Sequence, residues 1–306
     1  MKKNVFIIIF SLFLSSQAIA QNSTNIVVSI KPLHSLVSAV VGSSKNVSLL
    51  IGGNISPHNF ALKPSHAKLL NNSPVFFYID DQLESALKKT VKGLPDSTKV
   101  IKVSKFKNLK LLSVREGINW EEDGHDHHDH GHGHGSYDIH FWLDPDNAIQ
   151  IIKGVTQELS KIYPENINTY KKNAKEVIKK IQLADNSIKS MIEPIKDKPY
   201  IVFHDAYQYF EKAYGVNAIG SILLDPEIPP SPQRIIKIRS KINSLGAKCV
   251  FKEPQFRAQI INTVIEGSDV KVGILDPLGA DLEPGLNMYV DLLENISNNL
   301  LGCLAK

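Results

Sequence analysis

Histidines at the ends of short apolar runs are the residues of this chain best suited to bind a metal ion. His58 lies in GGNISPHNFALKP, after the run VSLLI, and His140 lies in YDIHFW. His204 ends YIVFH, and Asp276 ends VGILD. In an open α/β sheet, ligands bind beyond the carboxyl ends of the strands. A single histidine is more often structural, but this shared placement predicts that the four side chains form one site.

The donor set indicates which metal would bind there. Three neutral imidazoles, completed by a carboxylate or a water, suit tetrahedral zinc. Manganese prefers sites that are richer in oxygen, whereas copper and nickel remain alternatives because raw affinity rises toward copper. We therefore expect zinc, with manganese, copper or nickel as the alternative metals.

A second group of histidines lies in GHDHHDHGHGHG, residues 124–135. Its six members are His125, His127, His128, His130, His132 and His134. Glycine and aspartate between them bury nothing apolar, so the stretch cannot form a packed element. We expect the loop 121–135 to be a weak auxiliary zinc collector, and the alternative is a low-complexity insertion without a role.

Two further histidines fall within expected helices. His66, in PSHAKLL, is predicted to be a surface or first-turn residue. His34, in KPLHSLVSAV, follows the apolar run VVSI closely, so the sequence leaves open whether it contributes to the site.

The amino terminus resembles a secretory signal. Lys2 and Lys3 precede the apolar run 5–14, and Ala18-Ile19-Ala20 is a small-x-small cleavage site. Cleavage would remove residues 1–20 and lower the net charge from +4 to +2. No cysteine follows the cleavage point, which argues against a lipid anchor. The remaining lysines are scattered, so nucleic acid is not an expected partner.

Cys249 and Cys303 are the only two cysteines of the chain. In an exported protein an even count favours one disulfide, with two buried free thiols as the alternative. Closing a loop of this length would stabilise the fold by about 4 kcal/mol in the chain-entropy model.

Short apolar runs alternate with helical patterns in both halves of the chain. The runs are 25–30, 47–51, 75–79 and 99–103, then 200–203, 217–222, 248–253 and 270–276, and residues 109–114 could add an edge strand. This alternation predicts an α/β fold with two lobes, each a mainly parallel sheet flanked by helices. The mature length also suffices for two lobes with separate cores.

Residues 164–195 follow a 3–4 apolar spacing and are bracketed by prolines. They predict one long rigid helix, roughly 45 Å in length, that joins the lobes; the alternative is a helix packed on one lobe. The expected division is a signal peptide 1–20, an N-terminal lobe 21–160, a connecting helix 161–196 and a C-terminal lobe 197–306.

Several motifs together resemble one known family. They are SIKPL, PHNFALKPS, the histidine–acid loop, HFWLDP, FHDAYQYFEKAYG, PEIPPSPQR, CVFKEPQF and LDPLG, and they span essentially the whole mature chain. In this order they resemble the ZnuA-type periplasmic zinc-binding proteins of bacterial ABC importers. The resemblance implies two α/β lobes joined by a rigid helix, zinc captured between them and delivered to an inner-membrane permease, and a location in the periplasm.

Residue by residue, the resemblance places His58, His140 and His204 on the three histidine ligands and Asp276 on an aspartate near the metal. Manganese-type relatives carry a glutamate at the position of His204, so the histidine supports zinc. The cysteine pair falls on the family's disulfide. One departure is Pro57, where some zinc-type relatives have a glutamate that reaches the metal. The fourth ligand is thus Asp276, water or a loop histidine, and we expect Asp276 or water.

Other classes of function are less well supported. A secreted zinc hydrolase could use three histidines and a bound water, with Asp205 as its base, but H-E-x-x-H and nucleophile-elbow motifs are missing from the sequence. A helix N-cap or a partner to a histidine is the more common role for such an aspartate. A histidine-rich metal buffer would need the loop alone. We expect a monomeric binding protein, not an enzyme.

Overall fold

The computed structural model describes residues 25–42, 47–115, 137–223, 226, 228–257 and 259–305. The expected signal peptide and the histidine-rich loop lie outside these residues. No helix within the described ranges is long and apolar enough to span a bilayer.

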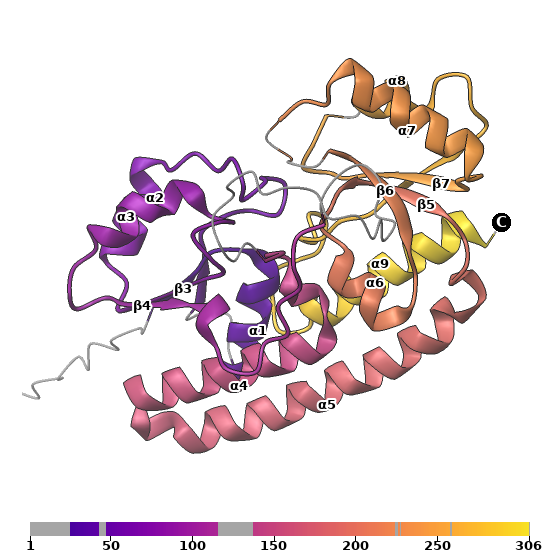
Figure 1. Cartoon of the computed structure of the whole chain (residues 1–306). Helices are drawn as coiled ribbons and strands as arrows, with labels where there is room; N and C mark the ends of the chain where they lie inside the picture. The colour runs from indigo at the N-terminus through magenta and orange to yellow at the C-terminus, as the bar shows by residue number, and fades with distance from the viewer. Residues whose placement is uncertain are drawn as a thin grey trace, which may run out of the picture.

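The described chain forms two lobes, each built on a four-stranded sheet whose strands all run parallel (Figure 1). The first sheet has the order β2-β1-β3-β4, and the second has the order β6-β5-β7-β8. The strands are β1 (Ile26–Val28), β2 (Val47–Leu49), β3 (Val75–Tyr78), β4 (Lys99–Lys102), β5 (Tyr200–His204), β6 (Ala218–Leu223), β7 (Cys249–Lys252) and β8 (Lys271–Ile274). Both sheets therefore have the same order: the second strand is added on one side of the first strand, and the third and fourth are added on the other side, so a switch point lies between β1 and β3 and between β5 and β7. Crevices that bind ligands form at such points.

Helices cover the sheets as the alternating pattern predicts. The first lobe carries α1 (Lys31–Val41), α2 (Pro64–Asn71) and α3 (Lys88–Lys92), with a 3-10 turn η2 (Ser85–Leu87) before α3. The second lobe carries α6 (Gln208–Tyr214), α7 (Pro232–Ser244), α8 (Gln259–Ile265) and α9 (Met288–Leu304). The predicted α/β fold with two parallel-sheet lobes is thus confirmed.

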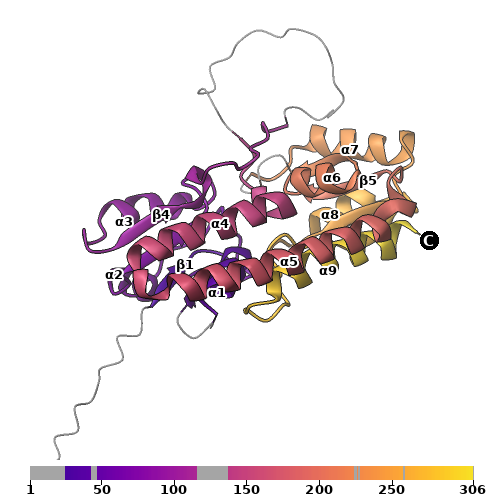
Figure 2. The ribbon, with the colours of Figure 1, turned by 90° about the horizontal axis from the view of Figure 1, so that it is seen from below.

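Two antiparallel helices run beneath the sheets, and only the second of them extends under both lobes. α4 (Pro145–Ile162) leads through the 3-10 turn η5 (Pro164–Asn166) into α5 (Ile167–Ile192), and η6 (Glu193–Ile195) follows. α5 packs on α1 and α4 in the first lobe and on α9 and α6 in the second, so it bridges the lobes (Figures 1 and 2). Its buried face is Tyr170, Ala174, Val177, Ile181, Ala184, Ile188 and Ile192. At 1.5 Å per residue its 26 residues span about 39 Å, slightly less than the sequence suggested.

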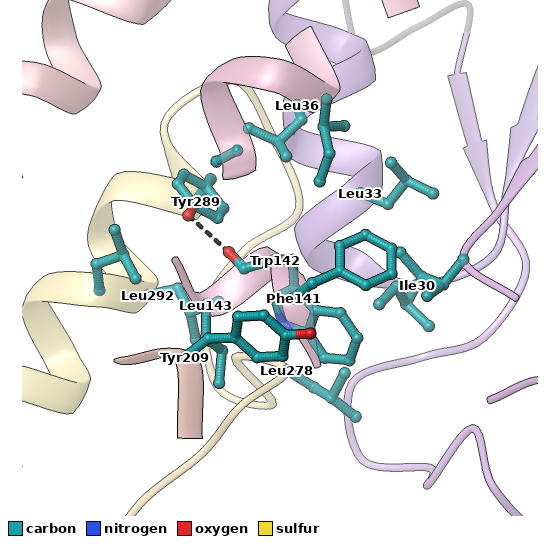
Figure 3. Close-up of a cluster of buried hydrophobic side chains, with 14 of the residues drawn as sticks. Ile30, Leu33, Leu36, Phe141, Trp142, Leu143, Tyr209, Leu278, Tyr289 and Leu292 are labelled. Atoms are coloured by element: carbon teal, nitrogen blue, oxygen red, sulfur yellow. Dashed lines mark hydrogen bonds between the residues drawn. The ribbon is translucent and has the colours of Figure 1, made fainter. Parts of the chain in front are cut away.

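The cores of the two lobes are not separate. One hydrophobic cluster runs from β1 of the first lobe to α9 of the second, and a smaller cluster fills only the second lobe. Residues 141–143, which form the 3-10 turn η4 (Phe141–Leu143), wedge between α1 and α9 at the centre of the larger cluster (Figure 3). Tyr289 Oη donates to the Trp142 carbonyl at 2.7 Å, and Trp142 Nε1 donates to the Pro277 carbonyl at 3.0 Å.

Polar contacts also hold the lobes together. The buried Lys31 ammonium, on the first turn of α1, donates to the carbonyls of Gly279, Ala280 and Leu282 at 2.8, 2.9 and 2.6 Å. A Cβ on Gly53 would lie 2.9 Å from the Ala280 Cα. A side chain there would push the lobes apart, so glycine permits this close approach.

The second lobe contains the expected disulfide. Cys249 of β7 is bonded to Cys303 of α9, with the two Cα atoms 6.3 Å apart. The bond ties the carboxyl-terminal helix to the central part of the second sheet.

One predicted strand is wrong. Residues 109–114 form no strand, and only Ser113 makes an isolated antiparallel bridge, to Tyr137. The Lys110 N–H donates to Asn147 Oδ1 of α4 at 2.8 Å, and the Leu112 N–H donates to Tyr209 Oη of α6 at 2.9 Å. Side chains of two helices thus accept the backbone N–H groups that would otherwise bond to a neighbouring strand.

Candidate metal centre

Three histidine nitrogens meet between the lobes. His58 Nε2 lies 3.3 Å from His140 Nε2, and His204 Nε2 lies 3.4 Å from the same atom. All three ligand atoms lie within 4.8 Å of one another, and this is the group of potential metal ligands found in the described part of the chain. The two shorter separations have the length of a tetrahedron's edge around zinc, about 3.3–3.4 Å for Zn–N bonds of about 2.0–2.1 Å.

His58 reaches the site from the loop between β2 and α2. Leu50 and Ile51 continue the path of β2, because their N–H groups donate to the carbonyls of Val28 and Ser29 at 2.8 and 2.9 Å. The chain then turns through Gly52 and Gly53 and brings His58 over the cluster. His58 is partly buried, whereas the other two histidines are buried.

His140 is oriented by the residues around it. It precedes η4, which is fixed in the interlobe core, and α4 begins five residues later behind an Asp144 N-cap. The Asp138 carboxylate accepts the His140 backbone N–H at 2.9 Å and faces its Nδ1 at 2.8 Å. An Nδ1–H donated to this carboxylate leaves Nε2 unprotonated and ready to bind a metal.

His204 has a similar arrangement in the second lobe. It is the last residue of β5, and its Nδ1 lies 2.7 Å from Glu253 Oε1, just after β7. β5 and β7 are neighbours that flank the crevice of the second sheet. The strand order therefore explains how a glutamate 49 residues away in the chain orients this histidine.

Burial and the neighbouring charges set the protonation of the cluster. Burial lowers the pKa values of His58 and His140 well below that of free histidine, and the nearby His204 lowers both further. Burial alone would lower the pKa of His204 as well, but the charge and hydrogen bond of Glu253 outweigh it and raise the pKa. Burial raises the pKa of Asp138 to about 7, against the lowering effect of the His140 N–H.

Asp276 does not join the three histidines. Its Oδ1 accepts the N–H groups of Leu278 and Gly279 at 2.9 and 3.0 Å, and its Oδ2 accepts the Ala280 N–H. Gln255 Nε2 donates to Oδ1 at 2.9 Å. The carboxylate thus closes the turn that follows β8, and it lies outside the group of potential ligands.

The remaining predicted residues lie elsewhere. His34 Nε2 bonds the Val47 carbonyl at 3.1 Å inside the first lobe. His66 is in the first turn of α2, partly exposed, with its Nδ1 accepting the Lys63 N–H at 3.0 Å. The six histidines of the loop 121–135 lie outside the described residues.

Asp205 neither caps α6 nor holds a histidine, so both of the common roles considered for it are wrong. It pairs with Arg115, whose guanidinium also bonds Glu211 Oε2 at 2.7 Å. Arg115 belongs to the first lobe and both carboxylates to the second, so the three residues form another cross-lobe contact, beside the histidine cluster.

The sequence pattern predicted no role for Asp138, Glu253 or Gln255. The sequence contains a signal for Glu253, because Glu253 ends the run 248–253 and His204 directly follows the run 200–203. The rule that ligands lie beyond the carboxyl ends of the strands, which selected the histidines, thus also selects the acceptor of His204. Asp138, two residues before His140, matches the short-range pattern in which an aspartate bonds the backbone N–H two residues on.

Comparison with known proteins agrees with this geometry. The model of the family ZnuA, zinc-uptake complex component A, periplasmic, matches residues 26–303. The chain belongs to the ZnuA family. It is 40% identical over 331 residues to the high-affinity zinc uptake system protein ZnuA of Brucella suis biovar 1 (strain 1330), covering 97% of this chain and 98% of that protein. It is 33% identical over 292 residues to the protein of the same name from Yersinia pestis, covering 92% of each chain.

The fold is also that of a solved member of the family. A crystal structure of ZnuA superposes with a TM-score of 0.76 at 22% identity, covering 91% of this chain and 98% of that chain. At this identity the superposition supports the fold, and the family membership rests on the sequence matches.

Proposed function

We propose that this protein captures zinc in the periplasm and delivers it to an inner-membrane ABC permease. The observation that carries the proposal is the spacing of the three Nε2 atoms, 3.3 and 3.4 Å along two edges, which suits tetrahedral zinc. The sequence relatives named as high-affinity zinc uptake proteins support the same cargo. The alternative cargoes manganese, copper and nickel have no comparable support from the donor set and the spacing together.

His58, His140 and His204 are the proposed ligands. Asp138 and Glu253 hold two of the rings and keep their Nδ1 atoms engaged. The fourth position is assigned to water rather than to Asp276, because both Asp276 oxygens already accept backbone hydrogen bonds. To reach a metal, the Asp276 carboxylate would have to break the hydrogen bonds that close the turn after β8.

The proposed function also assigns a role to the other segments of the chain. We assign 1–20 to a cleaved signal peptide, 21–160 and 197–306 to the lobes, and 161–196 to the connecting segment, in a monomer without a lipid anchor. A binding role fits better than catalysis, because the cavity lined by the three histidines has a volume of only about 10 Å³. That is room for about one water, whereas a hydrolase needs space for its substrate beside the metal.

Zinc titration of ligand variants tests the proposal. His58→Ala, His140→Ala and His204→Ala should each weaken the tight zinc event by more than the roughly 10–100-fold that follows loss of a ligand's hydrogen-bond partner. Chelator competition measures the dissociation constants. His66→Ala is the matched control, because His66 lies outside the cluster, and it should retain the unmodified affinity. Unmodified affinity in His204→Ala would refute the ligand assignment.

A further inference from the structure

Gln255 connects the two lobes beside the histidine cluster. Its side-chain Nε2 donates to the Gly53 carbonyl of the first lobe at 2.8 Å and to Asp276 Oδ1 of the second lobe at 2.9 Å. Both partners are acceptors, and only the NH₂ end of a glutamine amide can donate. The two bonds therefore fix which end of the amide is nitrogen, and Oε1 must point away from them.

The Oε1 atom is a buried acceptor that no donor among the described residues reaches. Gln255 lines the same small cavity as His58, His140 and His204. A buried acceptor without a donor costs free energy, so native proteins place a donor at such an atom. The amide oxygen of Gln255 thus calls for an N–H or O–H group that the described residues do not supply, and the cavity that Gln255 lines has room for one.

Glu253 Oε2 is also a buried acceptor that no donor among the described residues reaches, whereas the other carboxylate oxygens beside the cavity are engaged. Glu253 Oε1 faces Nδ1 of His204, and the Asp276 oxygens accept the turn that follows β8. Three imidazoles leave one position of a tetrahedral zinc open, and a water in that position is a strong hydrogen-bond donor. The cavity volume of about 10 Å³ is room for about one water molecule.

We propose that Gln255 positions the fourth zinc ligand, a water molecule whose O–H is donated to Gln255 Oε1. This inference rests on the proposed function, since it needs zinc on the three histidines. Gln255 acts through the water and is a positioning residue, not a ligand. The metal-bound water would in this way be held by an amide that is itself fixed by one residue from each lobe.

A zinc-bound crystal structure of the full-length mature protein is the direct test. We expect a water on zinc with Gln255 Oε1 within hydrogen-bond distance of it. A Zn–Oε1 bond of about 2.0–2.2 Å, a carboxylate in the fourth position, or a water with its hydrogen bond elsewhere would overturn the inference. This test does not depend on whether any variant folds.

Paired variants measure the contribution in solution. Gln255→Met removes the acceptor and the cross-lobe donor with little change in volume. Lys31→Met is the matched control, because it removes cross-lobe bonds to Gly279, Ala280 and Leu282 but does not line the cavity. We expect Gln255→Met to bind zinc roughly 10–100-fold more weakly than Lys31→Met, the range for residues that orient metal ligands.

Equal zinc affinities of the two variants would overturn the inference, because the loss would then be that of any cross-lobe bond. Failure of the proposed function gives a different result. In that case the unmodified protein itself would show no tight zinc event, whatever residue stands at position 255.

Discussion

At the residue scale, the site consists of two histidine–carboxylate pairs and one histidine carried by a loop. The three histidines could be predicted because strand ends converge in an open α/β sheet. Their partners could not be assigned so directly. Pairing Glu253 with His204 requires the order β6-β5-β7-β8, which places sequence-distant strands side by side. Asp276 was selected by the same rule, but its oxygens are used by the backbone of its own turn.

Zinc binding should release a proton from His204 just above pH 6.5. The pKa of His204 is raised in the metal-free protein, chiefly by Glu253 acting against burial, so the ring is still partly protonated there. His58 and His140, with lowered pKa values, are already neutral and release none. Zinc needs neutral imidazole. Calorimetry at pH 7 in buffers of different ionisation enthalpy should therefore give buffer-dependent heats.

Glu253→Gln is the control for this proton. It keeps an acceptor for His204 Nδ1 but removes the charge, so the pKa of His204 should fall and the release at pH 7 should shrink. Heats that do not depend on buffer in the unmodified protein would contradict the prediction. In both proteins zinc affinity should decrease as the pH falls further below 6.5, because protons then compete for all three rings.

At the element scale, the sequence predicted correctly those strands and helices whose backbone hydrogen bonds lie within the helix or within its sheet. The eight strands, α4 and α5 lie where the apolar patterns and the capping residues indicated. The strand predicted over residues 109–114 does not form, because Asn147 Oδ1 and Tyr209 Oη accept the backbone N–H groups of Lys110 and Leu112. That outcome depends on helices far along the chain, so alternation within six residues could not reveal it.

The start of α4 offers a test at this scale. Asp144, in the motif HFWLDP, accepts the Asp146 N–H at 2.7 Å and caps the helix that follows His140. Asp144→Ala should lower the free energy of unfolding by about 1 kcal/mol, the usual cost of losing such a cap. Asp144→Ser keeps a capping oxygen and should lose much less. Urea unfolding of the metal-free proteins measures both, and equal losses would show that the cap is not the stabilising interaction.

At the scale of the whole molecule, the lobes share a core, which the length of the chain did not predict. Phe141, Trp142 and Leu143 pack between α1 of one lobe and α9 of the other (Figure 3). The long helix α5 runs along both lobes and holds them from one side (Figure 2). His140 directly precedes this wedge, so the central ligand is attached to the part of the molecule that both lobes stabilise.

Deleting residues 121–135 tests how far this frame is independent of the histidine-rich loop. The described chain on either side is held by its own contacts: Ser113 is bridged to Tyr137, Tyr137 Oη donates to Asp80 Oδ2 at 2.8 Å, and Arg115 binds Asp205 and Glu211. The deletion should therefore leave the metal-free melting temperature nearly unchanged. Titration calorimetry should show the tight zinc event retained within a few-fold and the weak events lost.

A full-length variant with the six loop histidines replaced by serine separates the histidines from the length of the loop. It should behave as the deletion does, because imidazole is the commonest metal ligand and the loop carries six of them. The proposed ligands of the tight event are His58, His140 and His204, whose supporting groups Asp138 and Glu253 lie outside the deleted segment. If both variants fold but lose the tight event, a loop histidine supplies an essential ligand, and the assignment of water to the fourth position fails with it.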